Sequence, residues 1–137
     1  MGDGVAETIS ELAYFLLYFG IAVALVALYL FVYARVTAHN EFDLIRQNVL
    51  SAAVSLGLSL VGFALPLSSA IVHANNVIDL LVWGIVALVV QIVVYWLVRL
   101  LLPNLSERIA SGELSSALFL GATSVAAGII NAAAMNY

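Results

Sequence analysis

The sequence predicts an all-α integral membrane protein in which four transmembrane helices form two parallel two-helix repeats. Hydrophobic residues make up 65% of its 137 residues and charged residues 9%, whereas about a quarter of a soluble domain is charged. The apolar residues gather in four runs, each long enough to cross a hydrocarbon layer of about 30 Å as a helix. We expect spans at approximately residues 12–34, 49–70, 80–98 and 114–135.

The second half of the chain repeats the first at an offset of 64 residues. Residues 12–73 align without a gap with residues 76–137, and 15 of the 62 pairs are identical. Arg35 meets Arg99 in this alignment, which shared hydrophobicity alone does not explain. Each repeat holds two spans, so both insert the same way up, and a pseudo-two-fold axis along the membrane normal is expected. The chain from residue 1 to residue 137 is then a single membrane domain.

The first span carries no charge from residue 12 to residue 34. Thr8 followed by Glu11 is typical of a capping box, so we expect the helix to begin there, with a frayed terminus as the alternative. Aromatic residues near both ends are typical of the belts that anchor a spanning helix, with packing in the core as the alternative. They are Tyr14, Phe15, Tyr18 and Phe19 at the outer end and Tyr29, Phe31 and Tyr33 at the inner end.

A polar connection follows Arg35 and leads into the second span. Asn40 has the side-chain oxygen of an N-cap residue, and Asp43 places a carboxylate in the first turn. Apolar residues then recur at helical spacing. The second helix is therefore expected to start near Glu41 as a short amphipathic turn at the interface, and to enter the membrane at about Val49.

The second span, residues 49–70, carries three serines spaced four residues apart, and these serines share one helix face. Small residues on such faces let helix backbones approach closely in lipid. Gly57 lies nearby and Gly121 is its counterpart in the second repeat, so both are candidate helix-packing positions. Pro66 removes a backbone N–H and is expected to bend or end the helix. The serines are Ser51, Ser55 and Ser59.

The third span, residues 80–98, follows Asn76 and Asp79, which repeat the capping pattern. Gln91 is its strongly polar residue, and the count of residues places it near the middle of the bilayer. We place Trp83 at the outer end of this span, and Tyr95 and Trp96 at its inner end.

The second arginine-bearing connection carries Asn104 and Glu107, which echo the capping pair of the first repeat. We therefore expect Asn104 to cap the next helix. The fourth span, residues 114–135, carries Asn131 near its outer end.

Two interpretations are open for the polar residues within the spans. An amide at mid-membrane needs hydrogen-bond partners because hydrocarbon supplies none, and Ser55 or Ser59 lies at comparable depth on a neighbouring helix. In the first interpretation the polar residues join helices, each bond contributing roughly 1 kcal/mol or less. In the second they line a polar path through an oligomer. The residues concerned are Gln91, Asn131, Ser51, Ser55 and Ser59.

All four arginines fall in or beside the first and third connections. The positive-inside rule then predicts both termini outside and the two arginine-bearing loops in the cytoplasm. Arg35 and Arg99 end their spans as snorkelling anchors. Both are also candidates to bind anionic lipid headgroups.

Composition and motifs argue against several classes of function. A net charge of −4 speaks against nucleic acid, which requires a basic face, and the lack of cysteine excludes disulfides and thiolate sites. His39 and His73 fall on opposite sides of the membrane in this topology, so they do not share a metal ion within one chain. No acid or arginine lies at mid-membrane, where ion pumps usually need one. We find no catalytic or phosphate-binding motif and expect neither enzyme activity nor a cofactor.

A family resemblance rests on five segments, YARVTAHNEFDLIRQN, LPLSSAIVHA, WGIVALVVQ, RLLLPNLSERI and GIINAAAMNY. From Tyr14 to Tyr137 the chain resembles the YjfL-like family, small bacterial and archaeal inner-membrane proteins built from a duplicated domain of unknown function. The resemblance implies a four-span plasma-membrane protein without an established activity. Members often neighbour genes for membrane-stress proteins, which implies a role in membrane stress or maintenance. The chain departs at Ala38, where relatives often have proline.

Two functional hypotheses follow. The first is a non-catalytic membrane component that recruits partners or senses the bilayer, as a homo-oligomer with membrane-stress proteins as candidate partners. The alternative is an oligomeric ion channel or small-solute transporter. A central axis lined by Gln91 or by the serine face would favour the alternative, whereas a packed or lipid-filled axis would favour the first hypothesis.

Overall fold

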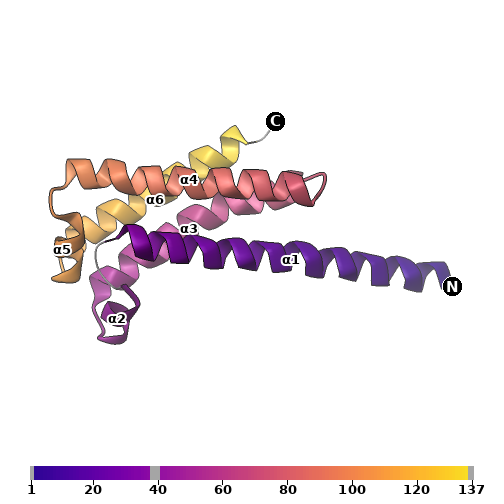
Figure 1. Cartoon of the computed structure of the whole chain (residues 1–137), viewed down its shortest axis with the longest axis horizontal. Coiled ribbons are helices and arrows are strands. Elements are labelled where there is room, and N and C mark those ends of the chain that lie inside the picture. The colour runs from indigo at the N-terminus through magenta and orange to yellow at the C-terminus, as the bar shows by residue number, and fades with distance from the viewer. Residues whose placement is uncertain (1, 38–40, 136–137) are drawn as a thin grey trace.

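The computed structural model describes residues 2–37 and 41–135, and within them the chain forms six helices and no strand. The helices follow the order long, short, long, twice over (Figure 1). The predicted duplication and its pseudo-two-fold axis stay predictions. The helices are α1 (Gly2–Val36), α2 (Glu41–Arg46), α3 (Leu50–His73), α4 (Val77–Leu101), α5 (Leu105–Ala110) and α6 (Leu114–Ala134).

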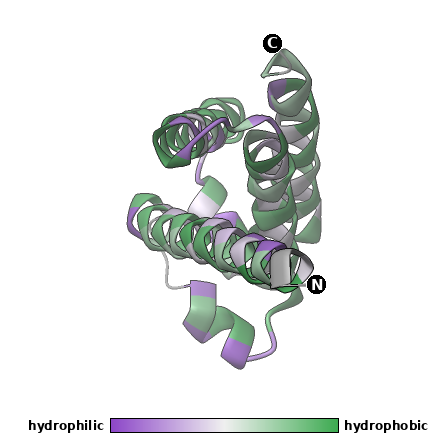
Figure 2. Cartoon of the chain, turned by 90° about the vertical axis from the view of Figure 1, so that its right-hand side faces the viewer, coloured by the Kyte–Doolittle hydropathy of each residue, from purple (hydrophilic) through white to green (hydrophobic). Residues whose placement is uncertain are grey.

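The four long helices are long and apolar enough to cross a membrane. In Figure 2 they are coloured mostly as hydrophobic, while hydrophilic residues lie on α2 and on connecting segments. The predicted all-α fold with four membrane-crossing helices is therefore confirmed.

α1 begins before the predicted capping box. The helix starts at Gly2, and the Thr8 hydroxyl donates to the carbonyl of Gly4, 2.9 Å away and one turn earlier. Thr8 lies inside the helix, so the predicted start is wrong. At a rise of about 1.5 Å per residue, the 35 residues of α1 extend about 50 Å, more than a hydrocarbon layer of about 30 Å requires.

The crossing of α3 and α6 forms the centre of the bundle. These two helices share the most extensive interface, α4 packs on both, and α1 packs on α3 and α4. The N-terminal half of α1 extends away from the other helices (Figure 1), and residues 4–17 are exposed. α2 and α5 lie at one end of the molecule and the termini toward the other. The two arginine-bearing connections therefore lie at the same end.

A turn with a left-handed residue separates each short helix from the long helix that follows. Asn48 has a φ of 66° between α2 and α3, and Gly112 has a φ of 96° between α5 and α6. Glycine and asparagine adopt this conformation more readily than other residues. The interfacial turn predicted at Glu41 is therefore a separate helix, α2, rather than the beginning of α3.

The predicted caps have different outcomes. The Asn76 side chain accepts a hydrogen bond of 2.8 Å from the backbone N–H of Asp79 at the start of α4, as predicted. Asn104 has a φ of 59° and its side chain makes no capping bond. An N-cap residue ordinarily has an extended backbone, so the prediction for Asn104 is wrong. Asn40 lies outside the described residues.

Pro66 lies inside α3, which continues to His73. Of the two predicted outcomes, the end of the helix at Pro66 is therefore wrong, and a bend there stays a prediction. Because proline has no N–H, the carbonyl of Gly62, four residues earlier, loses its usual helical donor. A partner for this carbonyl comes from another helix.

Candidate functional site

Gln91 joins three helices inside the bundle. This α4 side chain is 1% exposed. Its Nε2 donates to the carbonyl of Gly62 on α3 at 3.0 Å and to the carbonyl of Ser124 on α6 at 3.1 Å. The partners are thus backbone carbonyls, whereas the sequence pointed to Ser55 or Ser59.

The bond to Gly62 replaces the one that Pro66 removes. In a regular helix, the N–H of residue 66 would donate to the carbonyl of residue 62. Gln91 supplies the donor from a neighbouring helix, which is one way in which membrane helices tolerate proline. Leaving a buried carbonyl unpaired costs about 1–3 kcal/mol. Gln91 and Pro66 therefore act as one structural unit.

Two glycines let α3 and α6 approach at this point. A Cβ atom on Gly62 would overlap the carbonyl of Ser124, and one on Gly128 would overlap the carbonyl of Gly62. Both overlaps involve backbone, which cannot move aside as a flexible side chain can. The residues that meet where α3, α4 and α6 come together are therefore Gly62, Pro66, Gln91, Ser124 and Gly128.

The serine face of α3 is buried and hydrogen-bonded. Ser51 Oγ donates to the carbonyl of Ile109 on α5 at 2.6 Å, and Ser59 Oγ donates to Ser124 Oγ on α6 at 3.4 Å. Ser55 donates at 3.1 Å to a carbonyl of α3 itself. Two of the three serines therefore join α3 to other helices.

A cluster of buried aromatic rings fixes the C-terminal part of α1 against α3 and α4. Tyr29 stacks on Phe63 with ring centroids 4.5 Å apart, and its hydroxyl donates to the carbonyl of Ser59 at 3.3 Å. Tyr33 meets Tyr95 edge-on with centroids 5.7 Å apart. Both ring geometries are favourable.

The predicted inner aromatic belt is divided between the core and the outer surface. Tyr29, Tyr33 and Tyr95 are buried, whereas Phe31 and Trp96 are exposed. Residues four apart share a helix face, and a residue two positions away lies on the opposite side. The belt prediction is therefore wrong for Tyr29 and Tyr33, for which the alternative of core packing holds, and Tyr95 is buried in the same cluster.

Sequence reasoning also missed the burial of Glu41. This first residue of α2 is 1% exposed, and its carboxylate lies close enough to act electrostatically on Tyr29, Tyr33 and Tyr95. The Tyr95 hydroxyl lies 2.8 Å from Ser106 Oγ on α5. A charged residue at a helix start ordinarily faces water, so no local signal marks this one as buried.

Gly57 and Gly121 have different surroundings. A Cβ atom on Gly57 would meet nothing within 4 Å, whereas one on Gly121 would meet the side chain of Leu58. Gly121 thus lies at the α3–α6 interface, and Gly57 is exposed.

Asn131 Nδ2 on α6 is buried and has no acceptor within residues 2–37 and 41–135.

Gly121→Leu is expected to lower the melting temperature of the purified protein in detergent, because overpacking costs about 1–3 kcal/mol. Gly57→Leu, at the same place in the other repeat, is expected to leave the melting temperature unchanged because the space around Gly57 is open. Thermal unfolding followed by tryptophan fluorescence measures both. Equal losses in the two variants would contradict the placement of Gly57 on the outer surface.

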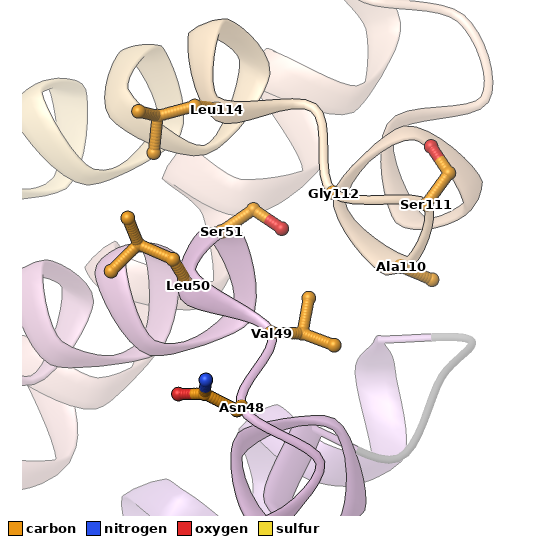
Figure 3. Close-up of a pocket in the computed structure, with 8 residues that line it drawn as sticks. All are labelled: Asn48, Val49, Leu50, Ser51, Ala110, Ser111, Gly112 and Leu114. Carbon is orange, nitrogen blue, oxygen red and sulfur yellow. The ribbon is translucent and has the colours of Figure 1, made fainter.

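Cavities open at the end of the bundle formed by α2 and α5. One of about 380 Å³ lies between the turn before α3 and the turn before α6 (Figure 3). Another, of about 220 Å³, lies beside Arg108 and Glu113, which form an ion pair of 3.8 Å. The first is lined by Asn48, Val49, Leu50, Ser51, Ala110, Ser111, Gly112 and Leu114.

The two predicted lipid anchors have different environments. The Arg35 guanidinium lies over the ring of Phe31, 4.8 Å from its centroid, within the range of a cation–π interaction. Arg99 instead lines a further cavity of about 290 Å³ together with Asn104 and Glu107. The repeat offset therefore pairs a stacked arginine with one that borders a cavity.

The histidines lie apart from these features. His73 is at the far end of α3, where its Nδ1 lies 2.9 Å from the carbonyl of Ser69, and His39 lies outside the described residues. Across the described ranges, no three His, Asp or Glu side chains are placed to hold a metal ion. Two features therefore stand out in the structure. Hydrogen bonds join the helices inside the bundle, and the end formed by α2 and α5 carries the cavities and the arginines.

Known proteins resemble this chain over most of its length. The family model described as Domain of Unknown Function (DUF350) matches residues 7–135. The UPF0719 inner membrane protein YjfL of Escherichia coli is 40% identical over 129 residues, which cover 94% of this chain and 98% of that protein. The UPF0719 transmembrane protein YshE of Bacillus subtilis is 27% identical over 95 residues, which cover 69% and 71%. No solved structure matches the chain.

The similarity to an inner-membrane protein and the four apolar helices together support a location in the plasma membrane. They also confirm the resemblance noted in the sequence. Because the family model spans nearly the whole chain and the Escherichia coli relative is covered almost completely, this protein belongs to the DUF350 family.

Proposed function

We propose that this protein is a non-catalytic, multi-pass component of the plasma membrane that acts in membrane stress or maintenance. In this proposal it contacts lipid and partner proteins through the end formed by α2 and α5. The observation that carries the proposal is the double donation from Gln91 Nε2 to the carbonyls of Gly62 and Ser124. A group that holds three helices together is not available to line a path for ions. The role in membrane stress rests on the family resemblance alone.

Liposomes that contain the purified protein are expected to pass no more ions than empty liposomes. Flux of potassium or protons, read from an entrapped fluorescent dye, measures this directly. A pore-forming peptide added at the end of each run confirms that the dye responds. Flux that rises with the amount of protein would contradict the proposal.

An oligomeric channel or small-solute transporter is the second candidate. The observation that favours it is Gln91 Oε1, which is buried and has no donor in the described part of the chain. Water or a solute in an oligomer could supply that donor. Single-channel currents whose conductance changes in Gln91→Leu would make this candidate the leading one.

The orientation in the proposal has both termini outside and both arginine-bearing connections in the cytoplasm. The protein has no cysteine, so single cysteines report without background. A membrane-impermeant thiol reagent on intact cells is expected to label His73→Cys and to spare Asn104→Cys. The reverse pattern would overturn the orientation.

The duplication, its pseudo-two-fold axis and assembly into a homo-oligomer also belong to the proposal. The repeated order of helices supports the duplication. The left-handed turns at Asn48 and Gly112, 64 residues apart, support it independently.

A further inference from the structure

Among the described residues, Arg99 is the arginine with neither an ion-pair partner nor a ring contact. Arg46 pairs with Asp43 at 3.1 Å, Arg108 pairs with Glu113, and Arg35 stacks on a ring. Among the described residues, Arg99 has no ion pair within 4.0 Å and no ring contact. It belongs to the last turn of α4, at the cavity-bearing end of the bundle.

The Arg99 cavity presents a positive and a negative group. Glu107, in the first turn of α5, lines the same cavity of about 290 Å³. No ion pair within 4.0 Å joins Arg99 and Glu107 in the described ranges, so both groups keep hydrogen-bonding capacity for a ligand. The Asn104 side chain adds an amide between α4 and α5. The volume lies near the lower limit of about 300 Å³ for ligand pockets, so it suits a headgroup rather than a whole lipid.

The chemical complement of this cavity is a small ligand with an anionic and a cationic group. A guanidinium binds phosphate oxygens through paired, charge-assisted N–H donors. A carboxylate accepts hydrogen bonds from a primary ammonium, which has three donors. We propose that the Arg99 cavity binds the phosphoethanolamine headgroup of a membrane lipid, with the phosphate on Arg99 and the ammonium on Glu107. This deepens the proposed lipid contact of the α2–α5 end.

Glu107 decides between lipid classes. A purely anionic headgroup gains from Arg99 but is repelled by the Glu107 carboxylate. A choline headgroup keeps a positive charge but has no N–H to donate. Of these three headgroups, phosphoethanolamine alone offers both a phosphate to Arg99 and a primary ammonium to Glu107.

The cavity wall is continuous with the buried aromatic cluster. Ser106 lines the cavity, and its Oγ lies 2.8 Å from the hydroxyl of buried Tyr95. Leu105 of the lining is buried as well. The inner wall of the cavity is therefore built on a core contact between α4 and α5, and the polar residues Arg99, Asn104 and Glu107 form its exposed rim.

Lipid binding to the detergent-purified protein tests the proposal. Native mass spectrometry with phosphatidylethanolamine, phosphatidylcholine and phosphatidylglycerol of identical acyl chains gives their relative affinities. We expect phosphatidylethanolamine to bind best, and Arg99→Gln to weaken it about tenfold. Arg46→Gln, the matched control, removes an arginine that pairs with Asp43 and does not line this cavity, so it is expected to leave phosphatidylethanolamine binding unchanged. Equal binding of the three lipids, or equal losses in the two arginine variants, would overturn the site.

Glu107→Gln provides a second test, because it is expected to change the affinities for two lipids in opposite directions. Removal of the carboxylate is expected to weaken phosphatidylethanolamine and to strengthen phosphatidylglycerol, each by roughly threefold. An unchanged ratio of the affinities for the two lipids would contradict the role of Glu107.

Soluble phosphoethanolamine is expected to compete only weakly with phosphatidylethanolamine. If it binds as tightly as the lipid does, the ligand of the cavity is not a membrane lipid. The lipid-free melting temperature of each variant shows whether it is folded, and ion flux through liposomes is a separate readout of the proposed function.

Discussion

Gly128→Ala is expected to destabilise the protein by about 3 kcal/mol, at the upper end of typical overpacking losses. The added Cβ atom would overlap the carbonyl of Gly62, so α3 and α6 must separate. These helices share the most extensive interface of the bundle. Their separation would also disturb the bond from Gln91 to the same carbonyl. Unfolding titration in mixed micelles measures the change in free energy.

Gly57→Ala is the matched control, because it adds the same methyl group to α3 where nothing lies within 4 Å. Alanine exceeds glycine in helix propensity by up to about 1 kcal/mol, so this variant should be as stable as the wild type or slightly more so. The expected change in the free energy of unfolding is therefore a loss for Gly128→Ala and no change or a small gain for Gly57→Ala. Similar losses in both would contradict the close approach of α3 and α6 at Gly128.

Gln91→Leu is expected to destabilise the protein by about 1–3 kcal/mol. Leucine has a similar size but cannot donate to the carbonyls of Gly62 and Ser124. The Ser124 carbonyl retains a possible helical donor four residues on, whereas the Gly62 carbonyl faces Pro66 and has none. Most of the loss is therefore expected from the bond to Gly62.

Thr123→Val serves as the control for Gln91→Leu. The Thr123 hydroxyl donates at 2.7 Å to the carbonyl of Phe119 within α6, and this bond is exposed. Valine removes a polar group of a spanning helix without breaking a contact between helices. We expect a change of less than about 0.5 kcal/mol, as is usual for surface positions. A comparable loss in both variants would mean that Gln91 does not hold helices together.

Hydropathy and residue counts were enough to predict four helices that are long and apolar enough to cross a membrane, because these properties depend on local sequence and helical rise. The partners of Gln91 were not predictable in the same way. They depend on the register in which α3 crosses α6, and on a carbonyl freed by Pro66 on a different helix. Such contacts are set by tertiary packing, which one sequence does not reveal.

The alignment of the two repeats did not predict the environments of the residues that it pairs. It paired Gly57 with Gly121 and Arg35 with Arg99, yet the members of each pair differ in packing. Each pair shares a residue type, but its neighbours come from non-identical segments. The cavity at Arg99 also needs Glu107, which the sequence presented only as a helix-capping residue.

A double-mutant cycle of Pro66→Ala and Gln91→Leu tests the central claim that Gln91 supplies the donor that Pro66 lacks. Alanine restores an N–H to the Gly62 carbonyl, so Gln91→Leu should cost about 1 kcal/mol less in the Pro66→Ala background than in the wild type, a coupling typical of residues that share a partner. Any strain relieved by Pro66→Ala alone cancels in the cycle. Free energies of unfolding that add within about 0.3 kcal/mol would contradict the claim and separate Gln91 from Pro66.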